Sequence, residues 1–521
     1  MTLTSKKHGI FQKMLEEKRK YFPETKLQLP RQKPAYTTKT LTLEDMDAAI
    51  EEQAGLSCKN IMSFPNEWAI TSIGEVCDVK GGKRLPKGEN FSNEITPYPY
   101  LRVTDFKSGK IDYSGIQYIS ESVFKGISNY TISSDDIYIS IAGTIGLVGI
   151  IQEKLNGSSL TENAAKLTNF TGVFKQYLLF ALKSSYAKNI FIENTVSSGQ
   201  PKLALFRIRD IEFPLPPLAE QKEIATLLDN LLAQVDTLKT RLDAIPNILK
   251  RFRQSVLAAA VSGKLTEDDS VEFIKKEKTI TTLQEVSSVI GGLTKNARRS
   301  DLPIKKPYLR VANVYENEFR LDDVSEIGVE EKELQRILLK ANDLLIVEGN
   351  GSLEHIGRAA LWKGEISDCV HQNHLIKVRV DENNQNAKFL LFYLMSPQGK
   401  AEIISKATSG AGLYTLSISK VASIQVPVFS LEEQEEIVRR VEELFAFADQ
   451  IEQRVKVAQQ RVNHLTQAIL AKAFRGELTA EWREQNPELI SGENSAAALL
   501  ARIQAEQKLK QGLAKPTRRQ T

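Results

Sequence analysis

The chain has 521 residues, which at about 150 residues per domain allows three or four folded units. Its 69 Lys and Arg residues nearly balance 65 Asp and Glu residues, and 41% of the residues are hydrophobic, as in an ordinary globular protein. The three cysteines, Cys58, Cys77 and Cys369, lie far apart, which excludes a disulfide scaffold and a cysteine-based zinc finger. No stretch approaches the roughly 20 apolar residues of a membrane span, so the sequence predicts a cytoplasmic protein without membrane contact.

The chain is a tandem duplication. Residues Leu218–Thr266 align without a gap on Leu431–Thr479, with 16 identities in 49 positions at an offset of 213. Shorter matches precede both segments: ITSIGEVCDVKGG (Ile70–Gly82) with ITTLQEVSSVIGG (Ile280–Gly292), and PYLRV at Pro99–Val103 and again at Pro307–Val311. Each half is therefore a variable block followed by a better-preserved segment.

The preserved segments carry apolar residues spaced alternately four and three apart. They are Ile224, Leu228, Leu231, Val235, Leu238, Leu242, Ile245, Leu249, Phe252 and Val256 in the first copy, and Ile437, Val441, Leu444, Ala448, Ile451, Val455, Ala458, Val462, Leu465 and Ile469 in the second. Such a stripe can also pack on its own domain, but two copies in one chain favour a coiled coil between them. Pro246 lacks a backbone donor and predicts that the first copy is divided into two helices, whereas Gln459 lets the second continue.

The variable blocks read as mixed α/β or α+β domains of about 150 residues. Alternating apolar runs predict strands, and amphipathic stretches predict helices. The predicted elements are strands at Ile137–Ile141 and Leu344–Val347, helices at Val173–Ala187 and Asn386–Met395, and closing strands that run into proline at Ile211–Pro217 and Ile424–Ser430.

Motifs for chemistry are missing from the sequence. No GxxxxGK[ST] phosphate loop is present, and the glycine-rich runs Gly143–Gly149 and Gly349–Gly357 do not fit GxGxxG, so neither ATP hydrolysis nor a dinucleotide or methyl-donor pocket is expected. His371 and His374 form an HxxH pair near Cys369, but without a HExxH helix or a second cysteine pair they are interpreted as hydrogen-bonded or surface histidines. No catalytic, cofactor or metal site is predicted.

Basic and polar side chains gather in loops of both blocks. Arg and Lys supply phosphate affinity, and polar or aromatic side chains can read bases, although one such loop alone can be merely solvated. The candidates for DNA contact are Lys80, Lys83, Arg84, Lys87, Ser198, Gln200 and Lys202 in the first block, and Lys295, Arg298, Arg299, Ser409 and Tyr414 in the second. Arg102 and Arg310, beside Tyr100 and Tyr308 in the PYLRV pair, are also candidates, with a structural role as the alternative.

Small residues lie beside the seam where each preserved segment ends. They let another helix approach closely, or they tighten the coiled coil itself. These candidates for subunit docking are Ala258, Ala260, Gly263, Ala471, Ala473 and Gly476. The stretch Ser495–Gln507 offers a further amphipathic surface.

Taken together, the segments LPPLAEQKEIATLLDNLLAQVD with ILKRFRQSVLAAAVSGKLT, and EEQEEIVRRVEELFAFAD with RVNHLTQAILAKAFRGELTAEW, resemble the specificity subunit of type I restriction-modification systems over about residues 65–500. The resemblance implies an α/β (α+β) fold in which two similar target recognition domains are separated by two long conserved helices. The resemblance further implies that these helices form an antiparallel coiled coil and that the whole is a pseudo-two-fold tandem repeat.

The resemblance also implies a function. Each block would read one half of a bipartite double-stranded DNA sequence, and the helices would set the gap and dock two methyltransferase (modification) subunits. Methyl transfer from S-adenosylmethionine, and cleavage with ATP and magnesium by the restriction (motor) subunits, would belong to those partners, so this chain would be a non-catalytic subunit that binds no cofactor.

The expected organisation has six parts. They are an N-terminal extension (1–63), target recognition domain 1 (64–217), a central helical region (218–266), target recognition domain 2 (267–430), a C-terminal helical region (431–479) and a C-terminal helix with a basic tail (480–521). The N-terminal extension lies outside the resemblance, which begins at about residue 65. Two alternatives are a standalone DNA-modifying enzyme, for which no site is found, and a coiled-coil scaffold without DNA specificity, which leaves the duplicated basic loops unexplained.

Overall fold

A computed structural model of the chain describes residues 64–107, 109–195, 201–266, 279–410 and 412–513. The predicted N-terminal extension lies outside these residues. Within them, no helix is both long and apolar enough to cross a membrane.

Domain 1, the block from residue 64 to 217, contains two four-stranded sheets with the strand orders β6-β3-β10-β7 and β2-β11-β8-β9. Its first and last strands, β1 and β12, form a separate antiparallel ribbon beside the start of α8. The strands are β1 (Ala69–Ser72), β2 (Asp78–Gly81), β3 (Pro99–Leu101), β4 (Phe106–Lys107), β5 (Lys110–Ile111), β6 (Gln117–Tyr118), β7 (Thr131–Ile132), β8 (Ile137–Ser140), β9 (Val148–Gly149), β10 (Ser158–Leu160), β11 (Ala164–Thr168) and β12 (Glu212–Leu215). The helices are α3 (Ile73–Val76), α4 (Glu121–Ile127), α5 (Lys175–Lys183), α6 (Ser185–Glu193) and α7 (Leu205–Arg209).

Domain 2, the described residues from 279 to 430, repeats this plan with the sheets β14-β23-β19-β21 and β18-β15-β22 and the closing ribbon β13-β26. The strands are β13 (Ile280–Thr282), β14 (Ser287–Gly291), β15 (Ile304–Leu309), β16 (Val314–Tyr315), β17 (Glu318–Phe319), β18 (Ser325–Val329), β19 (Leu344–Val347), β20 (Gly349–Asn350), β21 (Ala359–Leu361), β22 (Val370–His371), β23 (Leu375–Val380), β24 (Thr408–Gly410), β25 (Leu413–Thr415) and β26 (Gln425–Pro427). The helices are α9 (Leu283–Val286), α10 (Glu331–Ile337), α11 (Ala387–Met395), α12 (Pro397–Lys406) and α13 (Ile418–Ala422).

The predicted strands and helices are largely confirmed. All four residues of β8 and all four of β19 are buried, which explains their near-continuous apolar sequence. The helix predicted at Val173–Ala187 is in fact two helices, because Ser184 leaves the helical conformation and its hydroxyl accepts a hydrogen bond from the Ala187 amide to cap α6. Serine favours such N-cap positions over helix interiors.

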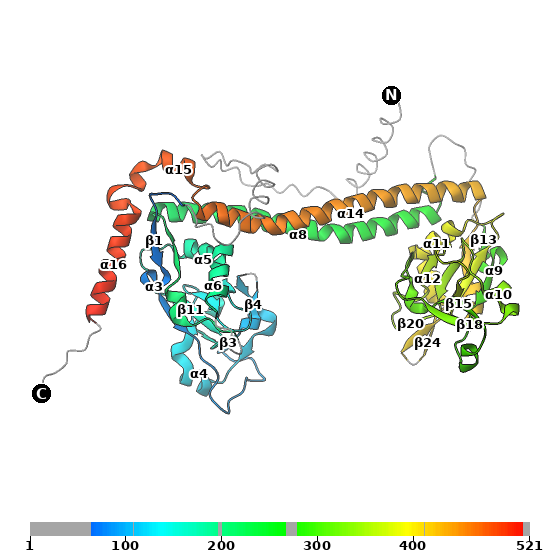
Figure 1. Ribbon diagram of the computed structural model, residues 1–521, viewed down its shortest axis with the longest axis horizontal. Coiled ribbons are helices and arrows are strands. Elements are labelled where there is room, and N and C mark those ends of the chain that lie inside the picture. Colours follow the sequence, from blue (N-terminus) through cyan, green and yellow to red (C-terminus); the bar gives the residue numbers. More distant parts are fainter. Residues whose placement is uncertain (1–63, 108, 196–200, 267–278, 411, 514–521) are drawn as a thin grey trace, which may run out of the picture. The chain divides into compact units, whose positions relative to one another are not determined.

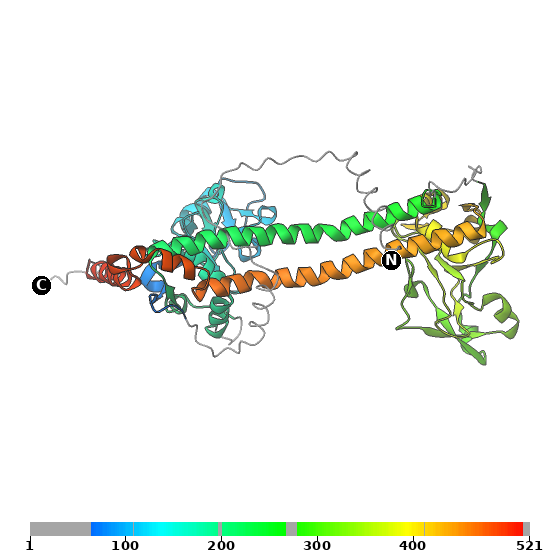
Figure 2. The same ribbon diagram turned by 90° about the horizontal axis from the view of Figure 1, so that it is seen from above.

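The preserved segments form the two long helices α8 (Leu218–Val261) and α14 (Leu431–Phe474), which lie side by side (Figures 1 and 2). Their direction is antiparallel. Arg253 of α8 pairs with Asp449 at 2.6 Å, whereas Asp243, earlier in α8, accepts a 2.8 Å hydrogen bond from Gln459, later in α14. The predicted antiparallel pair is therefore confirmed.

Pro246 does not divide α8, which runs unbroken through it, and that prediction is wrong. The proline itself is exposed, while the neighbouring seam residues Leu242, Ile245 and Leu249 are buried or half-buried. Proline removes one hydrogen bond from the helix, and packing of the seam on both sides of it keeps the helix continuous. Of the predicted seam residues, Leu238 alone is exposed, at 42%.

The chain continues after α14 into α15 (Ala480–Gln485) and α16 (Ala496–Leu513). The apolar side of α16 is buried against domain 1, where Ile503 is 1% exposed and fills the space beside Gly172. Gln507 also donates a 3.0 Å hydrogen bond to the carbonyl of Glu75 in α3. The amphipathic surface predicted for a partner is thus used within the chain itself.

Candidate nucleic-acid interface

Two basic loops carry most of the predicted cations, one after β2 in domain 1 and one after β14 in domain 2. Each loop begins at a glycine that packs closely on a neighbouring strand. A Cβ atom on Gly82 would lie 2.3 Å from the carbonyl oxygen of Leu160, and one on Gly292 would lie 2.1 Å from that of His371. Leu160 and His371 hold the same place in the two domains, since each pairs with the leucine of PYLRV. The GG dipeptide found in both halves of the sequence is therefore explained by close packing of backbones.

The tyrosine of each PYLRV motif also holds the basic loop of its domain, through a hydrogen bond to the loop backbone. Tyr100 donates a 2.7 Å hydrogen bond to the carbonyl of Lys83, and Tyr308 donates a 2.9 Å hydrogen bond to the carbonyl of Leu293. Burial raises the pKa of Tyr100 to about 12, so its hydroxyl stays protonated, and able to donate, even at alkaline pH. Both tyrosines fix the loops rather than face a ligand.

The predicted basic side chains of domain 1 are exposed: Lys80, Lys83, Arg84 and Lys87. The ammonium group of Lys83 lies 5.6 Å from the centre of the Tyr130 ring, within the range of a cation–π contact. Arg84 forms a 2.9 Å ion pair with Glu162 but keeps 78% of its side chain exposed. The loop therefore presents positive charge to solvent on a fixed base.

The second predicted loop of domain 1 is described in part. Ser198 and Gln200 lie outside the described residues. Lys202 is exposed and forms a β-bridge with Ala142, at the glycine-rich turn that follows β8. A role of this loop in DNA contact stays a prediction, and Lys202 is the one of its three candidates that the structure describes.

Domain 2 divides its predicted basic residues between two roles. Lys295 and Arg298 are exposed. Arg299 is 15% exposed, and its guanidinium forms two hydrogen bonds with the Glu333 carboxylate, at 2.8 and 2.9 Å, and a third with the Thr294 carbonyl at 3.0 Å. The arginine lowers the pKa of Glu333 to about 2. The contacts of Arg299 therefore stabilise its own loop, whereas Lys295 and Arg298 remain candidates for contact with phosphate.

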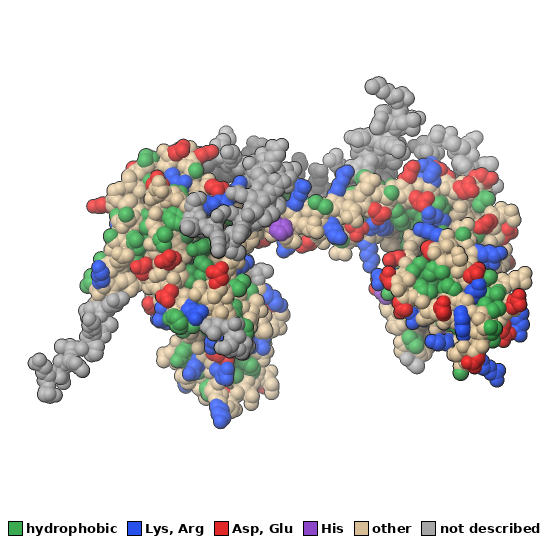
Figure 3. Space-filling view, viewed as in Figure 1, with side chains coloured by type: hydrophobic (Ala, Val, Ile, Leu, Met, Phe, Trp, Pro, Cys, Tyr) green, Lys and Arg blue, Asp and Glu red, His purple; other side chains and the backbone are tan. Residues whose placement is uncertain are grey.

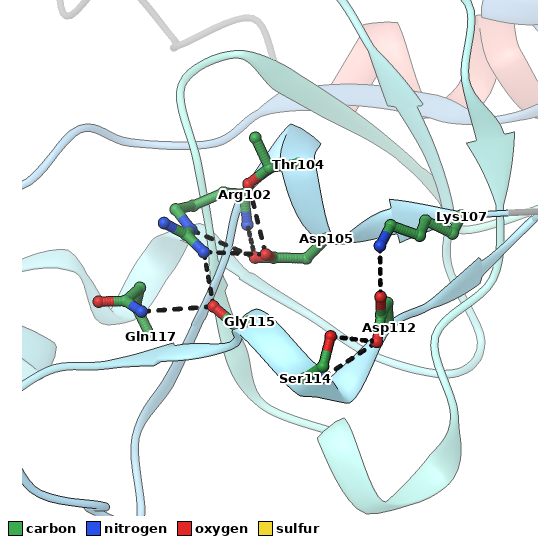
Figure 4. Close-up of polar contacts among 8 residues, drawn as sticks. All are labelled: Arg102, Thr104, Asp105, Lys107, Asp112, Ser114, Gly115 and Gln117. Atoms are coloured by element: carbon green, nitrogen blue, oxygen red, sulfur yellow. Dashed lines mark hydrogen bonds and ion pairs between the residues drawn. The ribbon is translucent and has the colours of Figure 1, made fainter. Parts of the chain in front are cut away.

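The arginines of the PYLRV pair are likewise engaged within their domains. The guanidinium of Arg102 binds the buried carboxylate of Asp105 at 3.0 Å and the carbonyl of Gly115 at 2.5 Å (Figure 4). Arg310 binds the carboxylate and carbonyl of Asp323 at 2.7 and 3.2 Å. These contacts favour the structural alternative for both arginines.

The predicted turn at Ser409 and Tyr414 is a β-hairpin. Strands β24 and β25 pair Ser409 with Tyr414, and β25 also pairs with β20. Ser409 is exposed and Tyr414 is half-buried. The run that begins at Gly349 joins this hairpin through β20, a pairing that the sequence does not indicate because the two segments lie far apart in the chain.

Folding accounts for most of the small residues predicted to dock a subunit. Ala260 and Ala473 are fully buried, which corrects the expectation that they face a partner. Gly263 and Gly476 have φ of 76° and 75° and end α8 and α14, a left-handed position that favours glycine. Ala258 and Ala471 are half-buried and stay candidates.

The HxxH histidines are hydrogen-bonded, as interpreted from the sequence. His371 is buried with Nδ1 2.9 Å from the carbonyl of Leu375, and Nδ1 of His374 lies 2.9 Å from the Glu348 carboxylate. Among the described residues, no three His, Cys, Asp or Glu side chains gather as metal ligands.

Charge on the drawn face of the molecule is mixed: Lys and Arg side chains alternate with Asp and Glu over both domains (Figure 3). Positive charge is therefore a local property of loops. The model of the type I restriction modification DNA specificity domain matches residues 65–247 and again residues 275–458. This chain belongs to the type I restriction-modification specificity family.

Curated relatives agree along nearly their whole length. The chain is 36% identical over 458 residues to the EcoKI specificity subunit of Escherichia coli K12, covering 85% of this chain and 96% of the relative. It is 35% identical over 473 residues to the StySPI specificity subunit of Salmonella potsdam, covering 86% and 97%. As a specificity subunit, the chain serves DNA recognition and not catalysis, and these matches give no support to a scaffold without DNA specificity.

Solved structures share the fold of this specificity subunit. The HsdS subunit of Thermoanaerobacter tengcongensis has a TM-score of 0.52 at 17% identity, over 80% of this chain and 98% of that one. A structure described under complex assembly and conformational transition of the type I R-M system has a TM-score of 0.53 at 15% identity, over 80% and 99%.

Proposed function

We propose that the specificity subunit recognises a bipartite double-stranded DNA target, with one recognition domain for each half. The observation that carries this proposal is the repeated loop support, in which a glycine and a tyrosine hold an exposed basic loop in both domains. Lys83, Arg84 and Lys87 in domain 1 and Lys295 and Arg298 in domain 2 contact phosphates, which position each domain on the duplex. The base-reading side chains come from the neighbouring turns around Lys202, Ser409 and Tyr414.

The proposal includes partners and their cofactors. The helix pair presents Ala258 and Ala471 at equivalent, half-buried positions, which supports two docking sites and hence two methyltransferase subunits for each copy of this chain. Restriction subunits complete the assembly. S-adenosylmethionine, magnesium and ATP act in those partners, and this chain binds none of them.

The test is a methylation map of a host that carries the complete operon. We expect methylation at one sequence made of two fixed halves separated by a gap of constant length. A single continuous motif, or methylation independent of this chain, would contradict bipartite recognition. Native mass measurement of the assembled complex checks the partners, and a methyltransferase ratio of one to one would contradict the two docking sites.

A further inference from the structure

Two fully buried glutamines lie at matching positions in the first turns of the long helices, Gln221 in α8 and Gln434 in α14. Both amides reach out of their helix and into the adjacent recognition domain. The Gln221 carbonyl oxygen accepts a 2.7 Å hydrogen bond from the Phe174 amide at the start of α5. The Gln434 carbonyl oxygen accepts a 2.8 Å hydrogen bond from the Asn386 amide at the start of α11.

The donor sides of the two amides match as well. Gln221 donates at 2.8 Å to the carbonyl of Pro216, in the connection from β12 to α8. Gln434 donates at 2.9 Å to the carbonyl of Phe429, in the connection from β26 to α14. Each side chain therefore joins three segments at one point: the long helix, the strand-to-helix connection and the first turn of a recognition-domain helix.

A second contact supports each joint further along the helices. Gln176 of α5 donates a 2.9 Å hydrogen bond to Asp229 of α8, and Lys388 of α11 forms an ion pair with Glu442 of α14. These second contacts are exposed, and exposed pairs contribute little. The buried glutamines are the stronger points, since a buried amide that loses its partners carries the full cost of desolvation.

We infer that Gln221 and Gln434 are positioning residues that fix where each recognition domain stands on the helix pair, and that they thereby hold the gap between the two half-sites at one length. This inference rests on the proposed bipartite recognition. The hydrogen bonds of the two glutamines go to the first turns of α5 and α11 and to the strand-to-helix connections, and not to the basic loops proposed to contact DNA, so their loss changes the gap that is tolerated and leaves the bases read within each half unchanged.

The experiment uses the complete modification complex and DNA that carries both half-sites, taken from the methylation map, with gaps of the cognate length and one base pair shorter or longer. Gln221→Leu and Gln434→Leu are compared with the wild type. Gln453→Leu is the matched control, because Gln453 is exposed on α14. We expect each joint variant to reduce the preference for the cognate gap by about tenfold or more, since leucine removes every hydrogen bond of the buried amide, and the control to leave the preference unchanged.

The outcomes separate the inference from the proposal beneath it. If the wild-type complex methylates DNA with all three gap lengths equally well, the proposed bipartite recognition is wrong. A wild-type preference that both leucine variants retain, with methylation equally weakened at every gap, overturns the inference and leaves a role in stability alone. If a leucine variant does not fold, Gln221→Met and Gln434→Met keep the length of the unbranched side chain and lose both hydrogen-bonding groups, and the same loss of gap preference is expected of them.

Discussion

The guanidinium of Arg483 donates a 2.6 Å hydrogen bond to the carboxylate of Glu220, a fully buried acid in the first turn of α8. Trp68 and Thr479 donate to the same carboxylate at 2.8 and 2.6 Å. One carboxylate thus joins the beginning of domain 1, the start of α8 and the segment that follows α14. Removing one partner of such a buried charge is costly, because the charge is left buried without compensation.

We predict that Arg483→Leu lowers the free energy of unfolding by about 3–5 kcal/mol, because Glu220 is left buried without its cation. Urea unfolding of the full chain at neutral pH measures the change. Arg502→Leu is the control, because Arg502 is exposed on α16. Equal stability of the two variants would show that Glu220 does not need the arginine.

A second prediction concerns pH and domain 2. Burial lowers the pKa of His371 from 6.5 to about 4. As the pH falls from about 6.5 to about 4, the unfolded chain takes up a proton that the folded domain does not, so stability present above pH 6.5 is lost over this interval, by about 3 kcal/mol at most.

The variant His371→Leu places in domain 2 the residue that domain 1 has at the equivalent position, Leu160. We expect its stability to vary less between pH 7 and 5 than that of the wild type, measured by urea unfolding at both values. An unchanged pH dependence in His371→Leu would assign the acid sensitivity to other groups.

The sequence predicted what depends on repetition and periodicity. The helix pair follows from the heptad stripe, and the duplicated domains follow from the offset alignment. Pro246 misled the prediction because the loss of one hydrogen bond was weighed without the packing of the seam around it. The site was harder to predict. Arg84 and Arg299 look alike in sequence, and each pairs with a glutamate, but only the fold shows that Arg299 is 15% exposed while Arg84 stays 78% exposed.

The same limit applied to the small residues. Gly263 and Gly476 end a helix, and a glycine just past a heptad stripe is a known signal for that role. Ala260 and Ala473 are buried beside other apolar residues, which the stripe alone did not reveal because they lie outside its spacing. Gln221 and Gln434 were visible as identities between the repeats, but their contacts join segments that the sequence does not place together.

A third prediction addresses the support of the basic loop. Tyr100→Phe removes the hydrogen bond to the Lys83 carbonyl and keeps the buried ring, so the domain folds while the loop loses one anchor, a contribution of about 1 kcal/mol. We expect affinity for the half-site of domain 1 to fall several-fold, measured by competition between DNAs altered in one half. Tyr113→Phe is the control, since its ring faces Lys154. Equal loss at both half-sites would indicate a general defect.

The last prediction concerns the exposed basic side chains themselves. Lys83→Ala combined with Arg84→Ala removes two cations that are exposed in domain 1, and Lys295→Ala combined with Arg298→Ala does the same in domain 2. Each phosphate contact contributes about 0.9 to the slope of log affinity against log salt, so each double variant should flatten the slope by about 2. Titration of DNA binding by the modification complex between about 50 and 200 mM salt measures the slope.

Arg299→Ala separates a charge that contacts DNA from one that supports the loop. Its guanidinium is bound to Glu333, so its loss should destabilise domain 2 and leave the salt slope per folded molecule nearly unchanged. The double variants should do the reverse, because exposed side chains contribute little to folding. A salt slope that stays at the wild-type value in both double variants would remove these loops from the interface and direct attention to the turns around Lys202 and Tyr414.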